Sequence, residues 1–278
     1  MTRLQKLHQY VNERGLQWTV LHVVRSICMN IPHDMSKPIH YLEKSMIEIE
    51  REKFLTGDST ISSLYHTVQM NRSMWNSFDW SRYGEEWTYD AQTYTGLEPN
   101  RWKESLINGM LYKYIEKDSI VLEIGPGAGR WTEFLQPIAR RLLVADIAEK
   151  CLSICQERFR TCGNIEYYLI NSRTLDFVPD NSIDYIWSYD VFVHINPTDT
   201  ENYISEFQRI LRPGGCAIIH HPDAHLFQEE ETTCWRSYTI DKKFFAHLVE
   251  RYGFRLVEQN DALVHKPGDL ISVFRKPK

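Results

Sequence analysis

Three glycines at alternate positions are the first candidates for a ligand-binding loop in this sequence. Gly125, Gly127 and Gly129 end a short apolar run, and Pro126 lies between the first two. Glycine lets a backbone turn tightly and come close to a ligand. Glu123, two residues before the first glycine, would repel a pyrophosphate but suits a ligand that carries positive charge. These residues predict a binding loop for a cationic small molecule.

The spacing of this loop differs from the fingerprint of dinucleotide-binding folds. That fingerprint, Gly-x-Gly-x-x-Gly, has a small residue three positions after its second glycine, where this chain has Arg130. A nicotinamide-dependent oxidoreductase is therefore the weaker interpretation, although it stays open. A non-catalytic nucleoside-binding subunit is a second alternative, against which the complete glycine loop argues.

A carboxylate follows the next apolar run. Asp146 ends the run Leu142–Ala145, and Ile147 comes directly after it. An acid at the end of a second strand can accept hydrogen bonds from both hydroxyls of a ribose, as it does in nicotinamide enzymes. Its alternative role is to cap the helix that begins near Ala148. We expect Asp146 and Ile147 to line a nucleoside site.

Candidate bases follow two later apolar runs. His194 is the first choice for a general base, because a histidine with a near-neutral pKa can accept a proton from a hydroxyl. Asp190 could orient that base or bind an ammonium group. His221 begins the run His-Pro-Asp-Ala-His, which could form a substrate wall, supply a base or join Asp190 in a metal site. Because histidines in turns are usually solvated, we expect no metal.

The elements that would position these residues alternate between strands and helices. Such alternation predicts a parallel sheet covered by helices on both faces, and two final strands without a helix between them predict an antiparallel strand at the end. We therefore expect a doubly wound α/β fold with a mostly parallel seven-stranded sheet. The expected strands are 119–125, 142–146, 165–170, 183–188, 216–221, 254–259 and 270–275, and the expected helices are 130–139, 148–160, 198–211 and 241–252.

The first part of the chain has a different pattern. Apolar residues recur at helical spacing near residues 4–11 and again over 39–55, followed by a segment rich in aromatic residues. That segment is too apolar to be a free linker. We expect residues 1–110 to form a helical extension or lid, and residues 111–278 to form the catalytic domain.

Taken together, four stretches resemble the Rossmann-like (class I) S-adenosylmethionine-dependent methyltransferases. They are VLEIGPGAGRWTEFL, VADI, LINSRTLDFVPDNSIDYIWSYDVFVHI and FQRILRPGG, within about residues 100–278. The resemblance implies that the three glycines border the methionine part of the cofactor and that Asp146 holds its ribose. It also implies that Asn171 and Ser172 flank the adenine and that the backbone from Ser188 to Asp190 contacts the amino acid part. Ser172 departs from the family pattern, which often has an acid there.

The aromatic segment WNSFDWSRYGEEWT also resembles a segment of small bacterial methyltransferases from glycan and natural-product loci. This narrower likeness implies that Tyr83, Trp87 and Tyr89 cover the cofactor. The expected activity is methylation of a small molecule, O-methylation of a sugar or secondary metabolite above all. The sequence leaves open whether the nucleophile is oxygen, nitrogen or carbon.

Composition limits the partners and the compartment. The net charge of −5 argues against nucleic acid as the main partner. None of the six cysteines forms a Cys-x-x-Cys pair, and the first residues do not resemble a secretory signal, so we expect reduced thiols and a cytoplasmic protein. The stretch Leu16–Ile31 is too short and too polar to span a membrane. The oligomeric state stays open, since the helical extension could also join two copies as a homodimer.

Overall fold

The structure is a computed structural model that describes residues 67–171, 174–223 and 240–278, together with individual positions between Gln5 and Ile49. The chain divides into two compact units, of which the first comprises Met1–Leu64 with Gln228–Cys234. The second unit comprises Tyr65–Phe227 with Trp235–Lys278 and contains the sheet. Most of residues 4–11 and 39–55, for which we expected helices, lies outside the described residues.

A seven-stranded sheet runs through the second unit in the order β3-β2-β1-β4-β5-β7-β6. All neighbouring strands from β3 to β5 are parallel, whereas β7 is antiparallel to both β5 and β6. This confirms the expected mostly parallel sheet with an antiparallel last strand. The strands are β1 Ser119–Ile124, β2 Ala139–Asp146, β3 Ile165–Leu169, β4 Ile183–Ser188, β5 Leu211–Pro222, β6 Arg255–Asn260 and β7 Asp269–Arg275.

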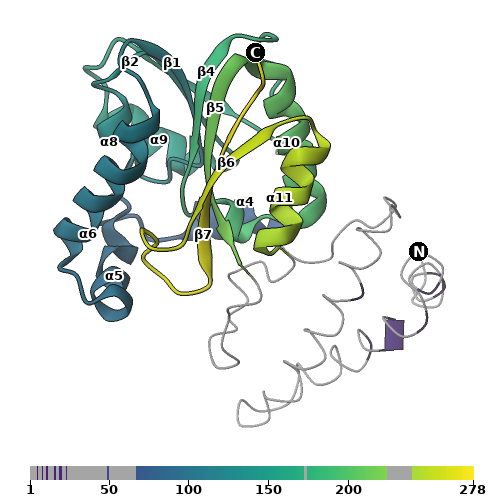
Figure 1. The fold of residues 1–278 in the computed structure, drawn as a ribbon. Coiled ribbons are helices and arrows are strands. Elements are labelled where there is room, and N and C mark those ends of the chain that lie inside the picture. The colour runs from purple at the N-terminus through teal and green to yellow at the C-terminus, as the bar shows by residue number, and fades with distance from the viewer. Residues whose placement is uncertain are drawn as a thin grey trace. The chain divides into compact units, whose positions relative to one another are not determined.

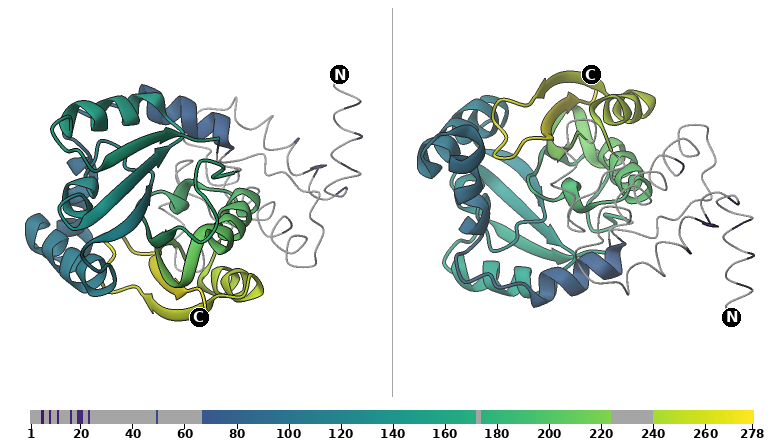
Figure 2. Two further views of the ribbon diagram at one scale, coloured as in Figure 1. Left: turned by 90° about the horizontal axis from the view of Figure 1, so that it is seen from above. Right: turned by 90° about the horizontal axis from the view of Figure 1, so that it is seen from below.

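Helices flank both faces of the sheet (Figures 1 and 2). Their boundaries follow capping residues: Asn196 accepts a hydrogen bond from the Asp199 N–H at the start of α10, and Asp241 accepts one from the Phe244 N–H at the start of α11. The helices within and after the sheet are α8 Thr132–Leu135, α9 Glu149–Arg158, α10 Pro197–Ile210 and α11 Lys242–Arg251, with a 3₁₀ turn, η4, at Phe192–His194.

Three expected elements have wrong boundaries, the first being the strand expected over 142–146, which begins at Ala139. The helix expected over 130–139 is only the single turn α8, because Pro137 has no N–H with which to continue it, and β2 already begins at Ala139. The strand expected to begin at Cys216 begins at Leu211, which pairs with Ile183 across the sheet. Pro213, Gly214 and Gly215, which lie between the expected helix and the expected strand, are therefore part of β5.

The segment before β1 is helical and packs on one face of the sheet. Trp102, Leu106 and Met110 are buried in one apolar cluster with Val121 and Trp187 of the strands. The boundary expected at residue 110 thus falls inside the second compact unit, and the division into two domains there stays a prediction. The elements are α4 Val68–Ser77, η2 Glu85–Trp87, α5 Thr88–Thr95, α6 Pro99–Leu106, η3 Ile107–Leu111 and α7 Tyr112–Tyr114.

Within the described part of the chain, no helix combines the length and the apolar character that crossing a membrane requires.

Candidate functional site

The glycine loop follows β1 at the carboxyl edge of the sheet. Gly125 and Gly127 have φ angles of +70° and +56°, which L side chains rarely adopt. A Cβ atom on Gly125 would lie 2.3 Å from the Val191 side chain, and one on Gly127 would lie 2.9 Å from Trp80. Both positions therefore need glycine for conformation and for space, while the carbonyl of Pro126 closes the turn by accepting the Gly129 N–H.

Glu123 lies beneath this loop as a buried carboxyl group. Its Oε2 accepts a hydrogen bond of 2.6 Å from the Thr132 hydroxyl. Its Oε1 is buried and has no hydrogen-bond partner among the described residues. Burial raises the pKa of Glu123 to about 8. A buried acceptor without a hydrogen bond lowers the stability of the fold. The free oxygen of Glu123 is therefore suited to accept a hydrogen bond from a ligand or to face a positive charge on it.

Asp146 ends β2 beside the glycine loop, as the sequence indicates. Burial raises the pKa of Asp146 to about 7, although the N–H groups of Ala148, Gly127 and Ile147 stabilise its charge. The Ala148 N–H lies 2.8 Å from Oδ1, so Asp146 does take part in starting α9. A carboxylate has about four lone-pair sites, so the three N–H groups leave acceptor capacity for a ribose hydroxyl, and this contact stays a prediction.

Helix α4 joins the ends of β2 and β3 through one side chain. Arg72 donates from Nε to the carbonyl of Ile147 at 2.8 Å and from Nη2 to the carbonyl of Ile170 at 3.1 Å. The two carbonyls flank the positions where the sequence predicts the ribose and the adenine. Arg72 therefore fixes α4 at the edge of the expected nucleoside site, a contact that the sequence analysis missed.

An aromatic cluster packs against the glycine loop. Trp87 stacks on Phe78 with ring centroids 5.1 Å apart and contacts Trp75 and Trp80 at 6.1 and 5.7 Å. Trp80 is the ring that meets Gly127. Trp87 thus lies in a layer over the loop, and its contact with the cofactor stays a prediction.

The other aromatic residues of the expected lid lie elsewhere. Tyr83 and Tyr89 are exposed, and their rings pack against the Arg158 and Arg82 guanidinium groups.

The remaining cofactor candidates lie on β4 and after β3. Ser188 is buried at the end of β4 and donates its hydroxyl to the Ile124 carbonyl at 2.9 Å, which holds the ends of β4 and β1 together. Asn171 is exposed just after β3 and accepts the Thr174 N–H. Ser172 lies outside the described residues.

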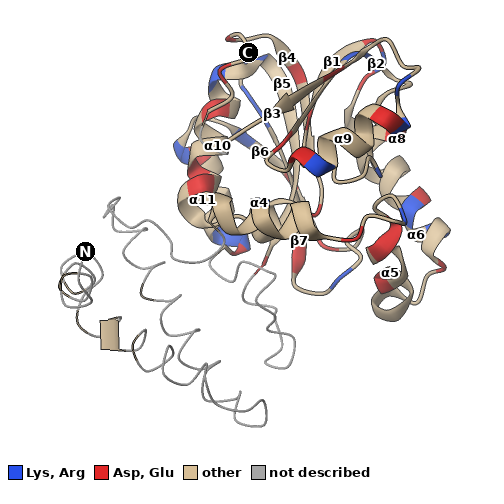
Figure 3. Ribbon diagram, turned by 180° about the vertical axis from the view of Figure 1, so that it is seen from behind, with Lys and Arg blue, Asp and Glu red and all other residues tan. Residues whose placement is uncertain are grey.

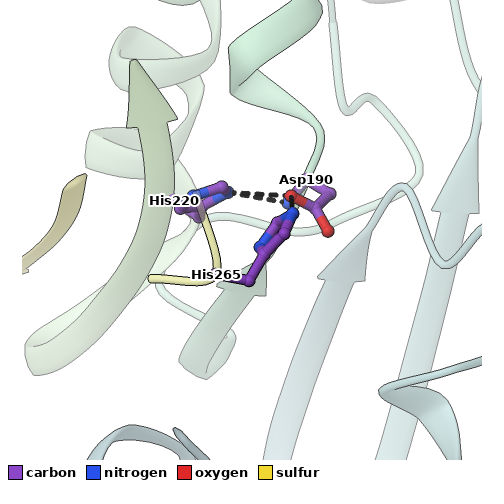
Figure 4. Close-up of side chains that lie close together, drawn as sticks. All are labelled: Asp190, His220 and His265. Carbon is purple, nitrogen blue, oxygen red and sulfur yellow. Dashed lines mark hydrogen bonds and ion pairs between the residues drawn. The ribbon is translucent and has the colours of Figure 1, made fainter. Parts of the chain in front are cut away.

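Asp190 lies at the centre of a network of charged and imidazole side chains (Figure 4). Its Oδ2 accepts a hydrogen bond of 2.5 Å from Arg130, which is buried. Its Oδ1 lies 3.3 Å from His220 Nδ1 and 3.7 Å from His265 Nε2. Asp190 also has a φ of +61°, so the chain holds it in an uncommon conformation after β4.

Each imidazole of this network has a partner on its other nitrogen. His220 Nε2 lies 3.2 Å from Asp269 Oδ2, and His265 Nδ1 lies 3.2 Å from the Tyr189 hydroxyl. His220 and Asp269 belong to the neighbouring antiparallel strands β5 and β7, whereas His265 belongs to the loop between β6 and β7. Three separate segments thus meet beside the end of β4.

The electrostatics of this network favour an ionised Asp190. Burial opposes ionisation, but His265, His220 and Arg130 hold the pKa of Asp190 well below its usual range. Burial likewise opposes a charge on His220, yet Asp269 and Asp190 raise its pKa overall. Burial lowers the pKa of His265 to about 4, so its ring is neutral near pH 7.

The two other catalytic candidates lie outside this network. His221 follows His220 on β5 and therefore points to the opposite face, where it stacks on Phe245 and contacts the Ser272 hydroxyl at 2.7 Å. Burial lowers its pKa to about 3. The structure thus separates His221 from Asp190, and we do not retain it as a catalytic candidate.

His194 ends η4 and packs edge-on against Trp75 of α4, with ring centroids 4.9 Å apart. Asn71 of α4 donates to its carbonyl at 2.7 Å. The ring is half-buried at the side of the aromatic cluster. Its role as a base stays a prediction.

Sequence reasoning missed His265 and Asp269 and gave His220 no distinct role. The first two lie about 75 residues beyond Asp190, in a stretch without a motif. Only the alternation of side chains along β5 could have indicated that His220, rather than His221, faces the carboxyl-edge network.

The described residues fit a cationic nucleoside. Gly125 and Gly127 allow the tight turn of the loop, Glu123 offers a buried oxygen without a hydrogen-bond partner, and Asp146 lies beside the loop. No pyrophosphate-type glycine spacing is present in this loop.

Comparison with known proteins agrees with this geometry. A family described as "Methyltransferase domain" matches residues 121–215, from β1 into β5. A Mycolicibacterium smegmatis protein named "Probable S-adenosylmethionine-dependent methyltransferase" is 26% identical over 184 residues, which are 64% of this chain and 68% of that protein. The ubiquinone/menaquinone biosynthesis C-methyltransferase UbiE of Enterobacter sp. (strain 638) is 32% identical over 111 residues.

The match to UbiE covers 38% of this chain and 43% of that relative, so less than half of UbiE is represented. Among solved structures, the N-methyltransferase NodS from Bradyrhizobium japonicum WM9 superposes with a TM-score of 0.53 at 21% identity. That superposition covers 66% of this chain and 100% of NodS, and it shows the shared fold.

The family match and these relatives favour a methyltransferase over the nicotinamide oxidoreductase and the non-catalytic subunit that the sequence alone left open. The family match, the relatives and the shared fold support a class I S-adenosylmethionine-dependent methyltransferase, with S-adenosylmethionine as its cofactor.

Proposed function

We propose that the protein methylates a hydroxyl group of a small molecule, a sugar or a secondary metabolite. S-adenosylmethionine supplies an electrophilic methyl group on a positively charged sulfur. The proposal depends on one observation: the ionised Asp190, with His220 and His265 against it, lies directly after β4 at the same sheet edge as the glycine loop. A hydroxyl nucleophile must lose a proton as it reacts, and charged groups at this edge could assist that loss.

Different residues of the chain would bind the cofactor and accept the proton. Asp146 would hold the ribose, and Glu123 would complement the positive charge beneath the loop. Asn171 and Ser172 would flank the adenine, while Ser188 and Asp190 would present the end of β4 to the amino acid part. His194 remains our candidate for the proton acceptor, although it lies outside the network around Asp190.

The relatives support a small-molecule acceptor without defining its nucleophile. By their names, UbiE is a C-methyltransferase and NodS an N-methyltransferase. Lys and Arg are interspersed with Asp and Glu along the described helices (Figure 3), which favours a small molecule over nucleic acid. We also propose action in the cytoplasm, which the free thiols of Cys151, Cys155, Cys162 and Cys216 support.

A product assay tests the proposal. The protein would be incubated with S-adenosylmethionine and acceptors grouped as sugars, phenols, amines and carboxylic acids, and S-adenosylhomocysteine release would be measured. We expect turnover with a hydroxyl acceptor and none with its matched deoxy analogue. Turnover with amines alone would contradict O-methylation while leaving the methyltransferase assignment intact.

The His194→Ala variant tests the proposed base. We expect turnover on that acceptor to fall about 10²-fold, while the affinity for S-adenosylhomocysteine stays the same. Unchanged turnover would remove His194 from the chemistry.

A further inference from the structure

The network around Asp190 has the composition and the spacing of a metal site. One ligand atom from each of Asp190, His220 and His265 lies within 4.8 Å of the other two. We propose that these three side chains bind a divalent transition metal ion. This reverses the expectation from the sequence that the chain has no metal, and it uses His220 and His265 in place of His221 and His225.

The distances from Asp190 Oδ1 to the two imidazole nitrogens are close to the distances between ligands of one small cation. Asp190 Oδ1 lies 3.3 Å from His220 Nδ1 and 3.7 Å from His265 Nε2. Ligands bound at 2.0–2.2 Å to one ion in a tetrahedral or octahedral arrangement lie about 3.0–3.5 Å apart. The two Asp190 pairs therefore need a contraction of at most a few tenths of an ångström, while the two imidazole nitrogens lie within 4.8 Å of each other and would move closer on binding.

The outer nitrogens of both imidazoles are fixed as they are in metal sites. Metal-ligating histidines usually place their second ring nitrogen against a carboxylate or another polar group, which sets the tautomer and the ring orientation. His220 Nε2 has Asp269 at 3.2 Å, and His265 Nδ1 has the Tyr189 hydroxyl at 3.2 Å. Both inner nitrogens are thereby directed toward Asp190 (Figure 4).

Two existing contacts define how the cation would be accommodated. Arg130 binds Asp190 Oδ2, which leaves Oδ1 for the metal. His220 Nδ1 accepts a hydrogen bond from the backbone N–H of Asp190 at 3.1 Å, so Nδ1 carries no proton. A bound metal would take the place of this N–H at the Nδ1 lone pair. Asp190 is 17% exposed whereas the two histidines are buried, so the open coordination position would lie on the Asp190 side.

Two imidazoles and one carboxylate favour zinc, iron, cobalt or manganese over magnesium or calcium, which prefer oxygen ligands. A bound ion would polarise a hydroxyl oxygen of the acceptor and ease the loss of its proton to solvent. This role rests on the proposed O-methylation, whereas metal binding itself does not.

Calorimetry on the chelator-treated full chain tests the site with Zn²⁺, and absorption spectroscopy tests it with Co²⁺. We expect one Zn²⁺ site per chain and a Co²⁺ spectrum of nitrogen and oxygen ligands. His265→Gln should remove the site. Tyr189→Phe, which keeps every ligand, should weaken Zn²⁺ binding roughly 10-fold. His247→Gln, on an exposed position of α11, is the matched control and should bind Zn²⁺ as the unmodified chain does.

Binding of S-adenosylhomocysteine to every variant reports whether it is folded. A chain that binds this nucleoside but none of the ions would overturn the metal proposal and leave the methyltransferase function standing. Equal Zn²⁺ binding by the unmodified chain, His265→Gln and Tyr189→Phe, or a thiolate charge-transfer band with Co²⁺, would place the ion elsewhere and also overturn it. A chain that does not bind the nucleoside would count against the proposed function.

Discussion

Two parts of the carboxyl edge are built in different ways. The part beside β1 and β2 takes its residues from short, continuous stretches: Glu123 and the glycines come within seven positions, and Asp146 ends the next strand. The part beside β4, β5 and β7 assembles Asp190, His220 and His265 from segments 30 and 45 residues apart. We propose that the first part holds the cofactor and that the second activates the acceptor.

The two parts also differ in how they carry charge. Glu123 and Asp146 are buried carboxyl groups with raised pKa values, so a hydrogen-bond donor or a positive charge on a ligand would stabilise their ionised forms. Asp190 has a lowered pKa because protein groups already surround it. Loss of a side chain should therefore reduce ligand binding in the first part and the stability of the protein in the second.

The largest effect is expected at Asp190. Asp190→Asn leaves the buried Arg130 without its charged partner, and breaking a buried ion pair in this way costs about 3–5 kcal/mol. The free energy of unfolding, measured by urea denaturation, should fall by an amount in this range. Adding Arg130→Met should recover part of it. A loss under about 1 kcal/mol would mean that the network does not stabilise the fold.

At Asp146 the effect should appear in cofactor binding. Asp146→Ala should weaken S-adenosylhomocysteine binding by about 1–3 kcal/mol, because charged hydrogen bonds to the ribose are lost. Calorimetry measures the change. Asp184→Ala is the control, since Asp184 accepts the Ile120 N–H at 2.8 Å and pairs with Arg212 near the start of β4, away from this edge. Equal affinity in Asp146→Ala would remove Asp146 from the site.

Glu123 should make the stability of the unliganded protein depend on pH. Its folded pKa of about 8 exceeds the ordinary value of 4.5, so its protonated form stabilises the fold below pH 4.5 and this contribution is lost as pH rises toward 8. The slope should approach 1.4 kcal/mol per pH unit at most. Melting temperatures at pH 5, 7 and 9 should show a smaller decrease for Glu123→Gln. Parallel curves for the two proteins would contradict this.

The smallest effect is expected at the glycine loop itself. Gly127→Ala places a Cβ at φ +56° and 2.9 Å from Trp80, so stability should fall by about 1 kcal/mol and the cofactor should bind more weakly. Gly163→Ala is the control, because no atom lies within 4 Å of its added Cβ. If both variants bind S-adenosylhomocysteine equally well, the glycine at 127 serves neither space nor conformation.

The sequence predicted the sheet well because the strands are continuous apolar runs. Strands β1, β3, β4, β6 and β7 lie within one or two residues of expectation. The helix after the glycine loop was predicted too long because apolar residues continue in helical spacing past Leu135, while Pro137 ends the hydrogen bonding. The spacing of apolar residues shows which side chains can share a helix face. It does not show where a proline removes the N–H that the next helical hydrogen bond needs.

The candidate site was predicted unevenly. Gly125, Gly127 and Asp146 could be found because their roles depend on neighbours in the chain. Of the adjacent histidines His220 and His221, one faces Asp190 and the other faces Phe245, and the choice follows from the register of β5 against β7. That register is not visible in the motif.

The fold class and the position of the glycine loop can be predicted from the sequence, because both arise from residue types at fixed short spacings along one strand and the turn after it. The imidazoles that meet Asp190 can be identified only in the folded chain. Their proximity depends on β7 inserting between β5 and β6 and carrying Asp269 and the loop with His265 to the end of β4. Contacts between distant segments follow from strand order and side-chain direction, and neither is written in the spacing of the residues concerned.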